Sequence, residues 1–183
     1  MKLKTLGFLT TASVMLIGTN ANANLLLDIY AGGTVGVGGY TMYADGEHTS
    51  QSAMAYGGVI GIDLPLFRIE GEYNYIDGDD ATLNLGMANA YFKIPTPVVK
   101  PYIGAGIGTT FDSKYEPKNA PKIDIDDTVA YQGMLGLTLD LPVLPIKIDV
   151  EGRVLYANNI FEIANEKTDL LQYDGRVKLR YIF

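Results

Sequence analysis

LLQYDGRVKLRYIF, the stretch at residues 170–183, alternates between apolar or small side chains and polar, mostly charged ones. The first set is Leu171, Tyr173, Gly175, Val177, Leu179, Tyr181 and Phe183, and the second is Gln172, Asp174, Arg176, Lys178, Arg180 and Ile182. Successive side chains of a β-strand point to opposite faces, so the stretch predicts a strand with one apolar and one charged face. A strand of this kind suits a transmembrane barrel, with lipid outside and a polar interior.

Seven earlier segments show a similar alternation. We expect strands over Leu27–Tyr43, Ser52–Asp63, Phe67–Ile76, Thr82–Ile94, Val99–Phe111, Val129–Leu141 and Ile146–Tyr156. The fourth of them is ambiguous, and there we place Asn89 and Lys93 inside and Ala88, Ala90, Phe92 and Ile94 outside. With the last stretch, these segments predict an all-β fold, an eight-stranded antiparallel up-and-down transmembrane β-barrel.

The connections between these segments fall into two alternating classes. Three are short and contain proline, at residues 64–66, 95–97 and 141–145, and four are longer and acidic, at residues 44–51, 77–81, 112–127 and 157–169. Proline cannot donate to a strand ladder, so the short connections are expected to be turns. Outer-membrane barrels have short periplasmic turns and longer extracellular loops, so the acidic loops are predicted to face outside.

The first 23 residues have the pattern of a secretory signal peptide. Lys2 and Lys4 precede an apolar stretch from Leu6 to Ile17, and Ala21-Asn22-Ala23 provides a small-residue cleavage site. We expect cleavage after Ala23, export, and one barrel domain over residues 24–183. No apolar run beyond the leader approaches about 18 residues, which a membrane-spanning helix would need.

The charges of the predicted strands balance. Residues 24–183 hold 12 basic and 21 acidic residues, a net charge of −9, but the inward positions hold eight of each sign, so the excess is expected in the outer loops. Isolated buried charges are costly, so the inward charges are expected to pair. The predicted ion-pair network of the lumen comprises Arg68, Glu70, Glu72, Asp149, Glu151, Arg153, Asp174, Arg176, Lys178 and Arg180. The acidic balance argues against nucleic acid as a partner.

Four short motifs resemble the small outer-membrane β-barrel family: MANAYF at 87–92, PYIGAGIG at 101–108, AYQG at 130–133 and RYIF at 180–183. That family includes the barrel domain of outer membrane protein A and the opacity-type and attachment-invasion-type surface proteins. The resemblance implies a monomer in the Gram-negative cell outer membrane, surrounded by lipid and lipopolysaccharide. Leu179, Tyr181 and Phe183 resemble the C-terminal signal that the outer-membrane assembly machinery reads. The loops are short for an adhesin.

Several candidate sites lie in the predicted loops. His48 with Ser50 and Asp45 offers a nucleophile and base for a rim-sited enzyme acting on lipid A or peptides. The acids Asp79-Asp80 and Asp126-Asp127 resemble the paired acids of omptin-type proteases, which need a ten-stranded barrel and a longer chain. The same acidic loops offer oxygen ligands for Ca²⁺ or Mg²⁺ without a full calcium-loop pattern. We interpret all of them as solvated loops, and we expect no catalytic residues, metal or cofactor.

The expected role is therefore structural or surface-interactive. Asp124, Asp126 and Asp127 form a candidate partner-binding loop for cationic or host-surface partners. A narrow pore is the remaining alternative. The interior of an eight-stranded barrel is only just wide enough for side chains, so we expect a lumen plugged by ion pairs instead.

Overall fold

Nine β-strands make up the part of the chain that the computed structural model describes, which is residues 27–44, 47–78, 81–115, 123–125, 128–141, 143–163 and 166–183. The strands are β1 (Asp28–Ala44), β2 (Glu47–Asp63), β3 (Phe67–Gly78), β4 (Ala81–Lys93), β5 (Val99–Tyr115), β6 (Ile123–Ile125), β7 (Val129–Asp140), β8 (Ile146–Ile163) and β9 (Glu166–Ile182). These residues contain no helix that could cross a membrane. The predicted leader and its cleavage site at Ala23 lie outside the described residues.

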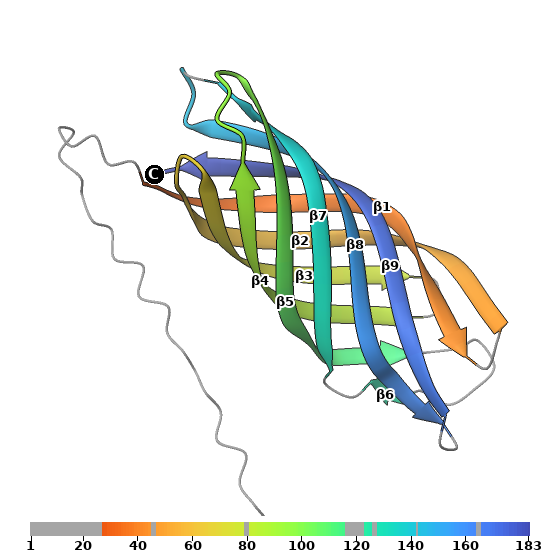
Figure 1. Cartoon of the computed structure of the whole chain (residues 1–183). Helices are drawn as coiled ribbons and strands as arrows, with labels where there is room; N and C mark the ends of the chain where they lie inside the picture. Colours follow the sequence, from red (N-terminus) through yellow and green to blue (C-terminus); the bar gives the residue numbers. More distant parts are fainter. Residues whose placement is uncertain are drawn as a thin grey trace, which may run out of the picture.

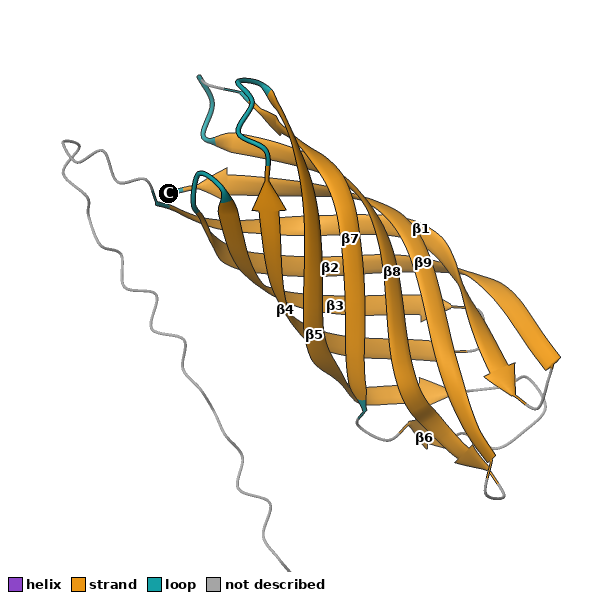
Figure 2. Ribbon diagram, in the orientation of Figure 1, coloured by secondary structure: helices purple, strands orange, loops and turns teal. Residues whose placement is uncertain are grey.

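Eight of these strands close into a barrel (Figures 1 and 2). Each pairs antiparallel with its neighbours in sequence, and β9 pairs with β1 from Tyr30↔Ile182 to Tyr43↔Asp169. The three-residue β6 pairs only with the end of β5. The predicted eight-stranded antiparallel barrel is confirmed.

The two ends of the barrel differ, and one of them departs from the expected pattern. The C-terminus and the short turns lie at one end, and the long hairpins project from the other (Figure 1). Following the orientation predicted from the loop lengths, we call the first the periplasmic end and the second the extracellular end. The expected loops at 44–51 and 157–169 are wrong, because β1 and β2 pair up to Ala44↔Glu47 and β8 and β9 up to Ile163↔Glu166. β5 and β6 likewise occupy part of the expected loop at 112–127. Much of the acidic excess therefore lies on strand ends, which are held by backbone hydrogen bonds.

The outer wall is apolar between two rings of aromatic side chains. Near the end with the short turns, Phe67 and Phe92 have ring centroids 5.6 Å apart, and Tyr181 and Phe183 are 5.4 Å apart. Nearer the other end, a tyrosine girdle faces outward from the strands: Tyr56, Tyr73, Tyr75, Tyr131, Tyr156 and Tyr173. Along β3, Phe67 and Tyr75 are separated by about 26 Å, or about 20 Å across a membrane at a tilt of about 40°. Aromatic girdles flank the lipid-facing band of outer-membrane barrels, so this is the part suited to hydrocarbon.

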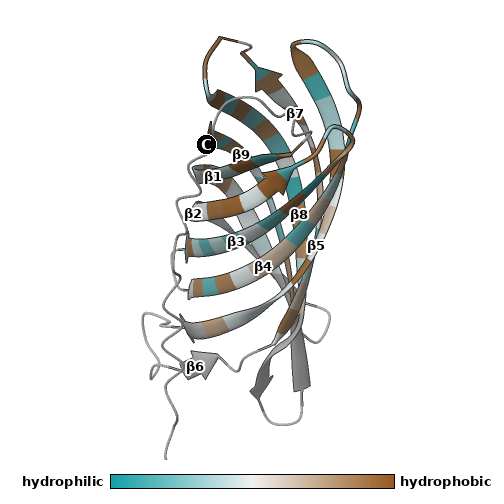
Figure 3. Cartoon of the chain, turned by 90° about the vertical axis from the view of Figure 1, so that its left-hand side faces the viewer, coloured by the Kyte–Doolittle hydropathy of each residue, from teal (hydrophilic) through white to brown (hydrophobic). Residues whose placement is uncertain are grey.

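Beyond the tyrosine girdle, the polarity of the two faces reverses. On β4, the outward positions are Thr82 and Asn84, whereas Leu83 and Leu85 are buried inside the barrel. Asp77 on β3 is also exposed on the outer wall. In Figure 3, apolar and polar residues alternate along the strands. The reversal keeps this alternation but exchanges the faces on which the two kinds of residue lie. The reversal explains why the fourth segment looked ambiguous in sequence, and it indicates that the strands continue past the hydrocarbon into water.

Candidate functional site: the barrel lumen

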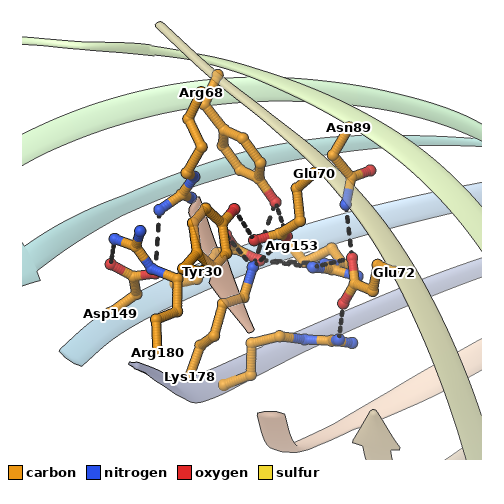
Figure 4. A network of polar contacts seen from close by, with 12 residues as sticks. Tyr30, Arg68, Glu70, Glu72, Asn89, Asp149, Arg153, Lys178 and Arg180 are labelled. Atoms are coloured by element: carbon orange, nitrogen blue, oxygen red, sulfur yellow. Dashed lines mark hydrogen bonds and ion pairs between the residues drawn. The ribbon is translucent and has the colours of Figure 1, made fainter. Parts of the chain in front are cut away.

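All ten charged residues of the predicted lumen network point into the barrel, and none is more than 6% exposed. Each of them lies in at least one ion pair. They come from β3, β8 and β9, whose inward positions carry charges in alternation with outward apolar residues. Figure 4 shows how the side chains converge across the lumen from strands far apart in the sequence.

Glu72 on β3 is the centre of the middle layer of the network. Its Oε2 lies 3.0 Å from Arg153 Nη2, and its Oε1 lies 3.1 Å from Arg176 Nη1. Asn89 Nδ2 also donates to Glu72 Oε2 at 2.6 Å. Arg153 pairs in addition with Glu151 at 2.7 Å. Charge-assisted hydrogen bonds of this kind are short and strong, and together they fix these side chains across the barrel.

The next layer toward the periplasmic end is built on two more buried acids. Glu70 accepts hydrogen bonds from Lys178 Nζ at 2.6 Å, Tyr30 Oη at 2.7 Å and Tyr91 Oη at 2.9 Å. Asp149 on β8 receives Arg180 Nε at 2.7 Å. The carboxylate oxygens of Glu70 and Asp149 thus accept hydrogen bonds from protein groups. These bonds compensate the two buried negative charges without solvent.

Arg68 has an unusual position among these groups. It is fully buried, donates to Asp149 at 3.0 Å, and its Cζ lies over the rings of Tyr91 and Tyr102, 3.8 and 4.6 Å from their centroids. Aromatic faces attract a desolvated guanidinium, so the two rings stabilise this charge. Room for Tyr91 comes from Gly104, where an added Cβ would lie 2.4 Å from the ring. The alternation in the sequence gives no sign of the roles of Tyr30 and Tyr102 as hydrogen-bond donors and ring partners inside the lumen.

A third layer of charges closes the periplasmic mouth. Lys93 pairs with Asp63, and Lys147 lies 3.1 Å from Asp63 and 2.9 Å from Asp28. These groups and the proline-containing turns line a cavity of about 450 Å³ that opens at this end. The mouth is therefore polar and open to solvent, whereas the charged side chains of the layers above it are almost fully buried.

The extracellular half of the lumen is predominantly apolar, with Thr110 and Gln172 as buried polar side chains beside the apolar ones, and this was not expected from the sequence. A cluster of buried side chains fills it: Tyr40, Ala53, Ala55, Ile76, Leu83, Leu85, Met87, Ala130, Leu155, Ala157 and Leu170. Leu85 and Ala130 have no exposed surface, and Leu83 has 3%. We call this set the apolar plug. It lies at the level of the tyrosine girdle and above, so charged and apolar layers follow one another along the lumen.

The other predicted site residues lie apart from the lumen or outside the described part. Leu179, Tyr181 and Phe183 face outward near the periplasmic end. The backbone of Asp124 lies in β6, and that of His48 in β2 opposite Tyr43. Asp45, Asp79, Asp80, Asp126 and Asp127 lie outside the described residues, as do the side chains of His48, Ser50 and Asp124. Within the described ranges, the structure brings together no group of three potential metal ligands.

No family model matches the chain, and no curated protein matches it. Among solved structures, neisserial surface protein A aligns with a TM-score of 0.60 at 15% identity, covering 85% of this chain and 97% of that one. The chain has the fold of the small outer-membrane β-barrels. The N-terminal barrel domain of OprF from Pseudomonas aeruginosa aligns with a TM-score of 0.52 at 14% identity, covering 81% of this chain and 97% of its own.

The outer-membrane barrel fold alone does not decide what this chain does. One fold hosts many unrelated functions, and function has to be argued from the site. Here the most distinctive site is the lumen, with its layers of ion pairs and its apolar plug.

Proposed function

We propose that this outer-membrane barrel has a structural and surface-interaction role in the Gram-negative envelope, and that it is neither a pore nor an enzyme. The observation that supports this role is the filled lumen. The eight inward bases and eight inward acids are all engaged in ion pairs, and the apolar plug lies above them. Ions would have to break several buried pairs and then cross a dry apolar layer, both of which are costly.

Planar-bilayer recording tests the closed lumen. We expect the refolded protein to show no steady conductance, because the paired charges and the apolar plug occupy the lumen along the part of the barrel that the structure describes. A barrel whose interior is just wide enough for side chains is blocked when those side chains are ordered. A stable, large conductance of the wild type would instead support the pore alternative.

Insertion is proposed to depend on the outward residues Leu179, Tyr181 and Phe183, which the assembly machinery would read. In the folded barrel, the backbone N–H of Phe183 donates to Ile29 O at 3.0 Å, so the last residue also helps to join β9 to β1. Deleting Phe183 is expected to lower the amount of folded barrel in the membrane fraction, measured by heat-modifiable electrophoretic mobility. Replacing the exposed turn residue Val143 with Ala serves as the control. Unchanged assembly of the truncated chain would contradict this role.

The extracellular end is proposed to make the contacts with partners, through Asp124, Asp126 and Asp127 in particular. The residues at this end carry the net negative charge of the chain, so they favour cationic partners or divalent ions that bridge to lipopolysaccharide. Changing these three to Asn is expected to weaken binding of a cationic peptide while the barrel stays folded, and salt is expected to weaken binding of the wild type. His48→Ala is expected to alter no activity. Loss of a lipid A modification or peptide cleavage on that change would favour the enzyme alternative.

A further inference from the structure

A shallow groove of about 740 Å³ crosses the outer wall of the barrel from β5 over β7, β8 and β9 to β1. Three outward-facing glycines lie along it, Gly133, Gly152 and Gly175, and its sides include Leu135, Val154 and Tyr173. The strand register places Gly152 directly beside Gly175 on one side and Leu135 on the other. Gly152 and Gly175 thus present no side chain at paired outward positions, and Gly133 lies diagonally from Gly152, opposite Val154. We call this feature the glycine groove.

Packing within the described chain does not account for these glycines. A Cβ at Gly133 or Gly175 would meet no atom within 4 Å, and at Gly152 the nearest would be Leu135 O at 3.9 Å. At the inward Gly136, by contrast, a Cβ would lie 2.5 Å from Val150 O. Glycine weakens a strand because it has no side chain to pack, so the outward glycines carry a cost that no internal contact offsets.

The depth of the groove limits what can occupy it. Gly133 and Gly175 are the next outward residues below Tyr131 and Tyr173 of the tyrosine girdle. The groove therefore lies just inside the extracellular boundary of the lipid-facing band, where the surrounding solvent is the hydrocarbon of the outer leaflet. An acyl chain fits an apolar groove at this depth.

A second groove continues from the first one toward polar residues of the outer wall. It has a volume of about 620 Å³, shares Val37 and Gly38 with the first, and continues over β1, β2 and β3. Ser52 and Asp77 lie at its far end, both exposed on the outer wall beyond the apolar band. The combined feature is apolar at membrane depth and polar where lipid head groups lie, which matches an amphipathic molecule lying along the wall.

We propose that the glycine groove holds one acyl chain of an outer-leaflet lipid, with the head group beside Ser52 and Asp77. The carboxylate of Asp77 and the hydroxyl of Ser52 accept hydrogen bonds from head-group hydroxyl or amine groups. The apolar chain fills the space left by Gly133, Gly152 and Gly175. This site deepens the proposed function, since it rests on the proposed membrane setting and names a lipid class as a specific partner.

Photo-crosslinking tests the groove with the full chain refolded into phosphatidylethanolamine–phosphatidylglycerol vesicles. The probe is a phospholipid that carries a diazirine midway along one acyl chain, and adducts are mapped by mass spectrometry. We expect wild-type adducts to concentrate on β7, β8 and β9 rather than on β3 and β4. The double change Gly133→Leu and Gly175→Leu is expected to lower them about fivefold, a loss of about 1 kcal/mol of binding. Ala88→Leu, an outward filling change on β4, is the matched control and is expected to have no effect.

Three results would overturn the lipid site. Adducts spread evenly around the wall would show that no groove retains a chain. A protein dimer captured in the same vesicles by a bifunctional crosslinking reagent, and abolished by the leucine changes, would assign the groove to a second copy of this protein. Failure of the milder Gly133→Ala and Gly175→Ala variants to fold would assign the glycines to strand bending. A chain that does not insert into vesicles would overturn the proposed function as well, whereas normal insertion with even labelling would overturn the groove alone.

Discussion

Arg153→Ala is expected to lower the free energy of unfolding by about 3–5 kcal/mol, the range for breaking one side of a buried ion pair. The Arg153 guanidinium contacts Glu72 at 3.0 Å and Glu151 at 2.7 Å, and these side chains are at most 1% exposed. Truncation leaves the carboxylates of Glu72 and Glu151 with less compensation at buried positions in the lumen. Urea titration of the refolded barrel, followed by electrophoretic mobility, measures the change.

Lys100→Ala is the matched control for this prediction. Lys100 pairs with Asp140 at the periplasmic mouth, where the two side chains are 25% and 19% exposed. Pairs that water reaches contribute about 0–1 kcal/mol, so this change is expected to cost much less than the loss of Arg153. Equal losses for the two variants would show that the middle layer of the lumen is hydrated, and the closed-lumen proposal would then lose its main support.

The second large effect is expected at Leu85, in the apolar plug. Leu85 has no exposed surface, so Leu85→Ala removes buried methyl groups and leaves a cavity, at a cost of about 2–5 kcal/mol. The same titration measures it. A polar, water-filled lumen would give a small effect, because little apolar contact would be lost.

Leu144→Ala provides the comparison for Leu85. Leu144 lies in the turn between β7 and β8 and is 53% exposed, so its truncation is expected to change the stability by about 0.5 kcal/mol or less. A loss at Leu85 no larger than at Leu144 would contradict the apolar plug. Leu135 is unsuitable as a control, because it faces the lipid-facing band and its truncation also removes apolar contact.

The barrel and its inward charges could be read from the sequence, because both depend only on alternation. A period of two assigns each residue of Phe67–Gly78 to a face without any knowledge of its partners. The pairing of the inward charges could also be predicted from the sequence, because equal numbers of opposite charges on the inner face must neutralise one another when buried. The eight strands were therefore predicted correctly, including the closing pair of β9 with β1.

The apolar plug and the length of the hairpins could not be read in the same way. Alternation tells which face a residue occupies but not how far along the membrane normal it lies. The outward face of β4 changes from apolar Ala88 and Ala90 to polar Thr82 and Asn84, because the strand passes from the hydrocarbon of the membrane into water. Polar residues near strand ends were accordingly mistaken for loops at 44–51 and 157–169.

The strand extensions beyond the tyrosine girdle raise the ends of the hairpins above the membrane surface. On β1, the pairing runs up to Ala44, which lies about 15 Å above the girdle at the tilt of a typical barrel strand. The hairpin tips are therefore carried on a hydrogen-bonded stem with its own apolar interior. A peptide grafted between β1 and β2 or between β8 and β9 would be displayed at a fixed height and orientation above the lipid surface. The same stem makes the chain a candidate scaffold for presenting epitopes on living cells.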